Sequence, residues 1–571
     1  MKLRGIRIKN FKSIRDLSLA FPESGILVLV GENNAGKSNI IRSIDMICGE
    51  SWYGREKLEE RDYYLKNTQN SIEVELYFED STEKRCAIFS SQEKWPVYYR
   101  GWQDKTKIYG SIKEDFPCTY LGADRTLDKH LSFYDWTLIG RIRKAFHKKI
   151  QPDLKTELDQ QYEALIQIFS QVPGFDDFKS DFSTFFDELY PHSKSRLNID
   201  FKPFTPANYF KTMQILAQDP IDEGSQLDVE ELGEGSRNLI LISLLRSYAK
   251  NFKGTGDLSG ILALEEPELF LHPQARRHLH HVLREIADSG IQIIISTHSA
   301  SFIDTEFFDD IGRVTKVRNN DDKEETNVVL CKKQDLVNHC ISTGVPEEKV
   351  NKDNIVEYYK TTSNARLNEG FFARCLILVE GETEELVIPE YLMNYCKSCD
   401  AMGISIIAVN GKNQIPKYWR LYSKFEIPII IVFDNDNGTG KEKSNQNIAT
   451  CFGLEIDDIL NVPQYSKVVN SNTTPQTQLL ILDTDFETCI QKELRQDELY
   501  REINEQARKL IKPIGKQQKG VIARYVCRKL KEKRPDFTPK LIRDLVTMLD
   551  DFLPVSSTNI QSNILDDDLP F

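Results

Sequence analysis

The feature that most constrains this chain of 571 residues is an apolar run that leads directly into a glycine-rich loop near the N-terminus. Residues 25–30 read GILVLV and residues 31–38 read GENNAGKS, which fits the pattern G-x-x-x-x-G-K-[ST]. In this pattern a buried strand delivers the loop to a helix N-terminus, where backbone N–H groups surround phosphate oxygens. The sequence therefore predicts an α/β fold with a nucleotide site, in which Lys37 neutralises phosphates and Ser38 ligates Mg²⁺. The other loop residues predicted to contact the nucleotide are Asn33, Asn34, Ala35 and Gly36.

The charge balance limits how such a protein can meet its ligands. Lys and Arg number 74, Asp and Glu number 87, and the formal net charge is −13. That total argues against a protein that coats nucleic acid with its whole surface, but it allows a local basic groove. No apolar segment follows the charged N-terminus and no run reaches roughly 18 apolar residues, so we expect a cytoplasmic protein without a membrane span. The 11 cysteines lack framework spacing, which favours reduced thiols.

Three further segments carry groups that suit nucleotide chemistry. The apolar run 261–264 is followed by Glu265 and Glu266, which suits a Mg²⁺ partner and a base that activates water. Residues 232–237, LGEGSR, precede a predicted helix, so Ser236 could help to present a second phosphate-binding helix N-terminus. The run 293–295 ends close to His298. Taken alone, residues 232–237 could be only a helix start, and His298 could be a structural polar group.

Together, in the chain order 31–38, 232–237, 265–266 and 298, the four segments resemble the ABC-type ATPase head of the structural-maintenance, recombination and repair proteins, and the N-terminal IRIKNFKSI fits as well. The resemblance implies a head-to-head homodimer in which Ser236 of one subunit caps ATP held by Lys37 of the other. It also implies Glu266 as the catalytic base and His298 as the γ-phosphate sensor. The usual Asp–Glu pair reads Glu265–Glu266 here, which leaves open which carboxylate does which task.

A second α/β unit is predicted after residue 370. The apolar runs 375–379, 404–409 and 428–433 alternate with helical stretches, and polar segments precede them. The sequence thus predicts an N-terminal ATPase domain and a following α/β domain, then a basic helical region and a disordered acidic tail. The predicted limits are 1–370 with a helical insertion at about 130–220, then 371–495, 496–554 and 555–571.

Carboxylates gather where two of these runs end. Glu380 follows the first run, and a spacing of four brings Glu384 near it if the next helix starts there. Asp434 and Asp436 follow the third run as a D-x-D, and residues i and i+2 of an extended segment face the same side. Clustered carboxylates suggest a hard cation such as Mg²⁺. The alternative for the sequence DNDNG is an ordinary turn.

The pairing of strand–Glu–Gly with a later strand–D-x-D resembles the Toprim domain of topoisomerases, primases and nucleases. An ABC-type head followed by Toprim resembles the OLD (overcoming lysogenization defect) family nucleases, which include effectors of Gabija and some retron anti-phage systems. The resemblance implies two Mg²⁺ or Mn²⁺ ions that activate water and stabilise the leaving oxygen of a DNA phosphodiester. It adds Glu487 as a metal ligand and Lys519 as the group that offsets charge on the phosphate. Lys519 could instead be one of many solvated lysines.

The function implied is an ATP-binding and ATP-hydrolysing, metal-dependent DNA endonuclease that nicks or cuts both strands, in phage defence. The implied partners are DNA, a further copy of the chain, and a defence-system partner such as a helicase or a reverse transcriptase with noncoding DNA. Two alternatives stay open. One is a non-nucleolytic ATP-gated DNA clamp of the repair type, and the other is a topoisomerase-like Toprim enzyme.

The C-terminal segments carry opposite charges. Residues 508–534 hold 11 Lys or Arg and one Glu at helical spacing, which favours a DNA-backbone face over a solvated helix. Residues 564–571, ILDDDLPF, resemble the acidic tip of single-stranded DNA-binding proteins. The sequence therefore suggests a tail that docks a partner which reads such tips, or that folds back on the basic segment.

Overall fold

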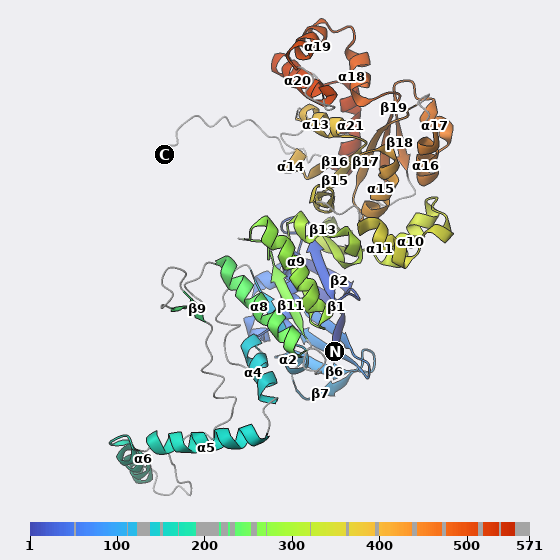
Figure 1. The fold of residues 1–571 in the computed structure, drawn as a ribbon. Coiled ribbons are helices and arrows are strands. Elements are labelled where there is room, and N and C mark those ends of the chain that lie inside the picture. Colours follow the sequence, from blue (N-terminus) through green and yellow to red (C-terminus); the bar gives the residue numbers. More distant parts are fainter. Residues whose placement is uncertain are drawn as a thin grey trace. The chain divides into compact units, whose positions relative to one another are not determined.

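The structure is a computed structural model, shown as a ribbon in Figure 1. It describes residues 1–50, 53–110, 112–122, 137–148, 152–169, 171–189, 216–218, 226–228, 234–252, 260–269, 271–319, 321–360, 365–393, 399–436, 442–470, 476–511, 518–535 and 538–553. The chain divides into two compact units. The first comprises Met1–Ile26 and Ser38–Ser296, and the second comprises Leu27–Lys37 and Thr297–Phe571. The glycine-rich loop is therefore counted with the C-terminal unit. The predicted domain limits remain predictions.

An antiparallel sheet in the first unit has the order β2-β1-β4-β5-β6-β7. Burial alternates along β4, as expected for a sheet with one face on the core and the other in solvent. Residues 71–78, SIEVELYF, show the same alternation of apolar and polar residues in the sequence. The strands are β1 (Lys2–Phe11), β2 (Ile14–Ala20), β4 (Glu73–Glu79), β5 (Lys84–Ser90), β6 (Val97–Arg100) and β7 (Thr106–Ile108).

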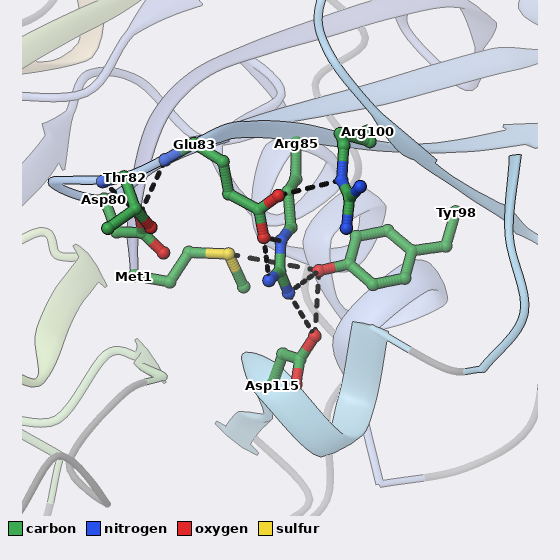
Figure 2. Close-up of polar contacts among 8 residues, drawn as sticks. All are labelled: Met1, Asp80, Thr82, Glu83, Arg85, Tyr98, Arg100 and Asp115. Carbon is green, nitrogen blue, oxygen red and sulfur yellow. Dashed lines mark hydrogen bonds and ion pairs between the residues drawn. The ribbon is translucent and has the colours of Figure 1, made fainter. Parts of the chain in front are cut away.

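A polar cluster joins β5 and β6 of this sheet (Figure 2). Arg85 lies opposite Arg100, a pairing that would destabilise the sheet if neither charge were compensated. The carboxylate of Glu83 pairs with both guanidinium groups, at 2.9 Å from Nε of Arg100. Arg85 also reaches Asp115 at 2.6 Å and Tyr98 at 2.9 Å. These charge-assisted bonds stabilise the pairing of β5 with β6.

A second sheet has the order β14-β13-β3-β12-β11-β8. All residues of β3, β11 and β12 are buried, in agreement with the apolar runs in the sequence. Strands β8, β11 and β12 run parallel, as do β3 and β13. The strands are β3 (Ile26–Val30), β8 (Cys118–Leu121), β11 (Ile261–Glu265), β12 (Gln292–Ser296), β13 (Ile311–Arg318) and β14 (Glu324–Leu330). The main helices nearby in sequence are α1 (Lys37–Cys48), α8 (Glu234–Phe252) and α9 (Pro273–Asp288).

The described part of the predicted insertion is mainly helical. It contains α4 (Leu138–Lys148), α5 (Pro152–Phe169) and α6 (Phe175–Leu189). The short strands β9 (Leu216–Gln218) and β10 (Gln226–Asp228) pair with each other. Helices α4 to α6 agree with the helical periodicity of the sequence.

The C-terminal α/β region contains a five-stranded sheet with the order β16-β15-β17-β19-β18. Strands β16, β15, β17 and β19 are parallel, and β18 is an antiparallel edge strand. The strands are β15 (Cys375–Val379), β16 (Ile404–Ala408), β17 (Ile429–Asp434), β18 (Tyr465–Asn470) and β19 (Thr477–Leu482). The helices between them are α13 (Glu382–Leu392), α14 (Cys399–Met402), α15 (Ile415–Ser423), α16 (Glu442–Phe452), α17 (Ile456–Leu460) and α18 (Phe486–Leu494). Parallel strands place their carboxyl ends at one edge, which is where the sequence predicts the metal site.

The predicted basic helical region shares the core of this sheet. It consists of α19 (Glu498–Leu510), α20 (Gln518–Lys533) and α21 (Lys540–Phe552). Ile503, Val526 and Leu545 from these helices belong to the same buried cluster as Ile377 of β15 and Val387 of α13. Within the described ranges, none of the helices combines the length and the apolar character that crossing a membrane requires. Residues 554–571, with the acidic tail, lie outside those ranges.

Candidate functional site

The glycine-rich loop folds as its pattern predicts, between β3 and α1. Gly31 and Gly36 have φ values of 140° and 116°, which favour glycine, and Asn34 is also left-handed at 60°. A Cβ atom at Gly31 would lie 2.0 Å from the carbonyl oxygen of Val314 on β13, so close backbone packing excludes a side chain there. Asn33 and Asn34 are exposed, whereas Ala35 and Gly36 are buried.

Lys37 is the first residue of α1 and is only 6% exposed. Its Nζ donates hydrogen bonds to the carbonyl oxygens of Gly31 and Glu32, each at 2.8 Å. Both of these acceptors are neutral backbone oxygens at the end of β3 and the start of the loop. Lys37 therefore remains suited to an anionic phosphate, and Ser38 follows it in the first turn of the helix.

The two carboxylates after β11 occupy different environments. Glu265 is buried, and its charge together with burial raises the pKa of the Tyr120 phenol, while Arg42 opposes this shift. Glu266 has a φ of 46°, unusual for a residue other than glycine, and its N–H donates to the Ser296 carbonyl at 2.8 Å. Strained backbone of this kind is common where a side chain must be aimed at a ligand. The left-handed backbone of Glu266 is consistent with a functional side chain at this position. It does not decide which of Glu265 and Glu266 would bind Mg²⁺ and which would act as the base.

The other two predicted nucleotide residues are less fully defined. His298 is exposed, two residues after β12 ends. Helix α8 begins at Glu234, so Ser236 lies inside its first turn, whereas the sequence suggested a helix that starts after residue 237. The side chain of Ser236 lies outside the described part of the chain. Its predicted contact with ATP remains a prediction, as does the one of His298.

The C-terminal sheet brings three predicted metal ligands together. Glu380 follows β15, and the D-x-D begins at the last residue of the neighbouring parallel strand β17. Glu380, Asp434 and Asp436 each offer a carboxylate oxygen, and these oxygens lie within 4.8 Å of one another. All three side chains are partly buried. The Asp434–Asn435–Asp436 segment does turn, with a φ of 46° at Asp436, but it also delivers both carboxylates to one place.

The electrostatics of this cluster suit a divalent cation. Burial and the neighbouring charge of Asp436 raise the pKa of Asp434, and one Asp434 oxygen is buried without a hydrogen bond among the described residues. Burial, with smaller effects from Glu487 and Glu380, raises the pKa of Glu384 to about 7. Burial and Asp485 raise the pKa of Glu487. A hard cation would relieve this repulsion and complete the coordination of the oxygens, so the residues fit Mg²⁺ or Mn²⁺.

Glu384 also has a structural task. Its Oε2 accepts a hydrogen bond from the Gly381 N–H at 3.1 Å, which caps α13 at its N-terminus. The expected proximity of Glu380 and Glu384 is reflected in their electrostatic coupling. Glu382 also lies in the first turn of α13, but it is not one of the three residues whose carboxylate oxygens lie within 4.8 Å of one another.

Lys412 is a residue of this site that the sequence did not reveal. It is 3% exposed, and its Nζ lies 2.8 Å from Oδ2 of Asp436 and 3.5 Å from Oδ1 of Asp434. It follows β16, the strand for which no functional residue was predicted. The available signal was the Gly411–Lys412 pair a few residues after the apolar strand β16, at the edge where the other strands deliver carboxylates.

Comparisons with known proteins identify a domain family in each of the two parts of the chain. The model of the AAA ATPase domain family matches residues 1–114 and 98–303, and the overcoming lysogenization defect protein-like TOPRIM domain matches residues 371–436. The OLD nuclease of Thermus scotoductus is 24% identical over 510 residues, covering 79% of this chain and 89% of its own. The Old nuclease of Escherichia phage P2 is 23% identical, covering 76% and 77%. This chain belongs to the OLD family.

Two other matches are shorter or weaker. Endonuclease GajA of Bacillus cereus is 23% identical over 235 residues, which is 38% of this chain and 32% of that protein. An SMC head domain of Thermotoga maritima covers 58% of this chain at 18% identity and a TM-score of 0.30. The predicted family and α/β fold, an ATPase head followed by a TOPRIM domain, are confirmed. ATPase and TOPRIM domains imply that this OLD-family chain uses a nucleotide and a divalent metal.

The last predicted residue of the site, Lys519, lies in the first turn of α20. Its side chain is outside the described part of the chain, but the position of the helix is defined by the next residue. A Cβ at Gly520 would lie 3.3 Å from Oγ1 of Thr383, in the first turn of α13. The start of α20 therefore lies beside the helix that carries Glu384.

The basic segment of this OLD-family chain is partly neutralised within the protein. Glu390 of α13 accepts from Arg524 at 2.7 Å and from Arg528 at 2.6 Å. These bonds lower the pKa of Glu390 despite its burial. Arg534 pairs with Asp497, and Lys529 pairs with Glu532. Part of the positive charge at 508–534 thus anchors α20, and the predicted DNA-backbone face has fewer unpaired cations than the sequence count suggests.

Proposed function

We propose that this OLD-family chain is an ATP-hydrolysing, divalent-metal-dependent DNA endonuclease. The observation that carries the proposal is the convergence of Glu380, Asp434 and Asp436 at the carboxyl ends of adjacent parallel strands, in a chain that also holds a phosphate-binding loop. The nuclease names of the relatives support phosphodiester hydrolysis as the reaction. An ATP-gated clamp without cleavage would not require such a cluster of desolvated carboxylates.

The residues divide the chemistry between them. Glu380, Asp434 and Asp436 would hold a divalent cation, with Glu384 and Glu487 as ligands of a second one. The cations would supply an activated water and Lewis acidity at the scissile phosphate. With no cation bound, the carboxyl of Glu384 would keep its proton in about half of the molecules near pH 7, because its pKa is about 7. Lys519, at the start of α20, would offset charge on the phosphate.

The nucleotide site is proposed to control this reaction. Lys37 and the surrounding loop would bind the phosphates of ATP, Ser38 and Glu265 would hold Mg²⁺, and Glu266 and His298 would act in hydrolysis. The paired arrangement, in which Ser236 of one subunit completes the site of another, remains part of the proposal. So do DNA as the substrate, a role in phage defence and the existence of a helicase or reverse-transcriptase partner.

The test is cleavage of supercoiled plasmid by the purified full-length chain with Mg²⁺ or Mn²⁺, with and without ATP. Asp434→Asn removes one ligand charge and keeps the side-chain shape, so we expect cleavage to fall by at least about 100-fold. ATP hydrolysis and the thermal unfolding temperature without metal serve as controls, because a folded variant should keep its ATPase activity.

The alternatives give different results in the same assay. A wild-type chain that binds DNA in an ATP-dependent manner but never cuts it would favour the clamp. Relaxed circles without nicks would favour topoisomerase chemistry. Undiminished cleavage by Asp434→Asn would contradict the proposed site.

A further inference from the structure

The metal site contains a cation of its own. The ammonium of Lys412 lies between the two carboxylates of the D-x-D, at 2.8 Å from Asp436 and 3.5 Å from Asp434. It also donates a hydrogen bond to Oδ1 of Asn445 at 3.1 Å. A buried ammonium is costly unless it is paired and hydrogen-bonded, and Lys412 has both kinds of contact.

The backbone fixes this lysine in place. Gly411 has a φ of 124°, and its N–H donates to the carbonyl oxygen of Glu380 at 2.9 Å. The loop after β16 is therefore tied to the end of β15, where the first metal ligand lies. The position of Lys412 is set by the same strand end that sets the position of Glu380.

The partner amide belongs to a second fixed network. Asn445, in α16, donates through Nδ2 to the carbonyl oxygen of Asn435, the residue between the two aspartates. Asn435 is buried and donates to the carbonyl oxygen of Ile459 at 3.1 Å. The amide that holds the lysine thus also holds the backbone of the D-x-D. These buried hydrogen bonds restrict the motion of the D-x-D backbone and of Lys412.

We infer that Lys412 is a built-in counter-cation, a positioning residue that holds Asp434 and Asp436 together without metal and lowers the affinity of the site for divalent ions. The inference rests on the proposed metal site and adds a residue that sets the affinity of this site for divalent ions. Three carboxylates and one ammonium leave a formal charge of −2, which matches one divalent cation. Without the ammonium the carboxylates would repel each other more strongly and attract a divalent cation more strongly.

The decisive measurement is the dissociation constant for Mn²⁺, determined by calorimetric titration of the full-length chain without DNA or nucleotide. In Lys412→Met we expect Mn²⁺ to bind about tenfold more tightly or more, because a positive charge close to the ion is removed while all ligands stay. We also expect the metal-free variant to unfold at a lower temperature and to gain more from added Mn²⁺ than the wild type does.

A matched control is available on α15. Lys417 is also buried, but its Nζ lies 4.0 Å from the centroid of the Tyr358 ring, and the structure records no carboxylate pairing with it in the described ranges. Lys417→Met should change stability without changing Mn²⁺ affinity. Lys412→Arg, which keeps the charge, should keep the affinity close to that of the wild type.

The outcomes separate this inference from the proposed function. A wild-type chain that binds no Mn²⁺ would remove the proposed metal site itself. A wild-type chain that binds Mn²⁺, with unchanged or weaker binding in Lys412→Met, would overturn the inference and leave the metal site standing. If Lys412→Met does not fold without metal, Lys412→Gln keeps a polar N–H donor at this position and removes the charge, and the same criterion applies to it.

Discussion

Lys37 and Lys412 are two buried lysines, one at each candidate site, and the acceptors that contact them in the described part of the chain include neutral carbonyl oxygens at Lys37 and carboxylates at Lys412. Lys37 is 6% exposed and donates to two neutral carbonyl oxygens, whereas Lys412 is 3% exposed and lies between two carboxylates. A buried cation held by carbonyl oxygens keeps its charge available to an anionic ligand. A buried cation held by carboxylates is already balanced and acts on a cationic ligand by repulsion. The first arrangement suits a phosphate, and the second tunes a metal site.

Among substitutions of these buried basic residues, we expect the largest effect from replacing Lys37. Lys37→Met should weaken ATP binding by about 100-fold or more, because the buried positive charge proposed to contact the phosphates is lost. Titration with a fluorescent ATP analogue measures this directly. Lys412→Met serves as the control and should leave ATP binding unchanged. Equal ATP affinity in Lys37→Met and the wild type would contradict the assignment of the loop.

The contrast also explains what could be predicted from the sequence. The loop at 31–38 and the acidic groups at 380 and 434–436 are short motifs that directly follow apolar strands. Their position along the sequence was therefore enough to predict them as site residues. Lys412 was missed because its partners, Asp436 and Asn445, are distant in the chain and meet it only through the order of strands in the sheet. No pattern of residue spacing within a single segment predicts the contacts of Lys412 with Asp436 and Asn445.

The ends of strands and helices were likewise predictable only where a continuous local pattern marks them. The predicted strands at 375–379 and 261–264 agree with β15 and β11 to within a residue, because continuous apolar runs define them. The start of α8 was placed too late, at residue 238 instead of Glu234. Its first turn, EGSR, contains three polar residues and a glycine, and such residues are typical of loops as well as of helix starts.

Arg313 extends the comparison to a buried cation outside both candidate sites, whose hydrogen bonds among the described residues go to backbone carbonyl oxygens. Its guanidinium donates to the carbonyl oxygens of Phe425 and Glu426 at 3.1 Å and of Ala373 at 2.9 Å. Burial lowers its pKa to about 10. These bonds tie β13 to the segments that enter β15 and β17.

Removing this side chain should destabilise the fold. Arg313→Met loses three charge-assisted bonds and leaves buried carbonyl oxygens unsatisfied, so we expect the free energy of unfolding to fall by about 3 kcal/mol. Urea unfolding followed by circular dichroism measures the change. Arg318→Met, on the same strand but at an exposed ion pair with Asp322, should change stability by less than about 1 kcal/mol. Similar losses in the two variants would contradict a structural role for the buried bonds.

His339 shows a third outcome of burying a basic group, the loss of its charge, and it gives the smallest expected effect. It lies in α10 (Lys333–Ser342), with its Nε2 3.1 Å from Oγ of Ser423 and its ring packed at 5.1 Å from Trp419. Burial, helped by Lys424 and Arg420, lowers its pKa from 6.5 to about 4. The folded chain therefore resists a proton that the unfolded chain accepts.

The sign of the pH dependence follows from this lowered pKa. The stability is fully present above the unfolded pKa of 6.5 and is lost as the pH falls toward the folded value near 4. Between about pH 7.5 and about pH 5, this single group should cost roughly 2 kcal/mol of unfolding free energy. His339→Gln keeps a polar side chain that does not titrate, so its unfolding free energy should decline less over the same range. Parallel pH profiles for the variant and the wild type would show that His339 titrates normally in the folded chain, and burial without a carboxylate partner would then not be enough to discharge a basic group here.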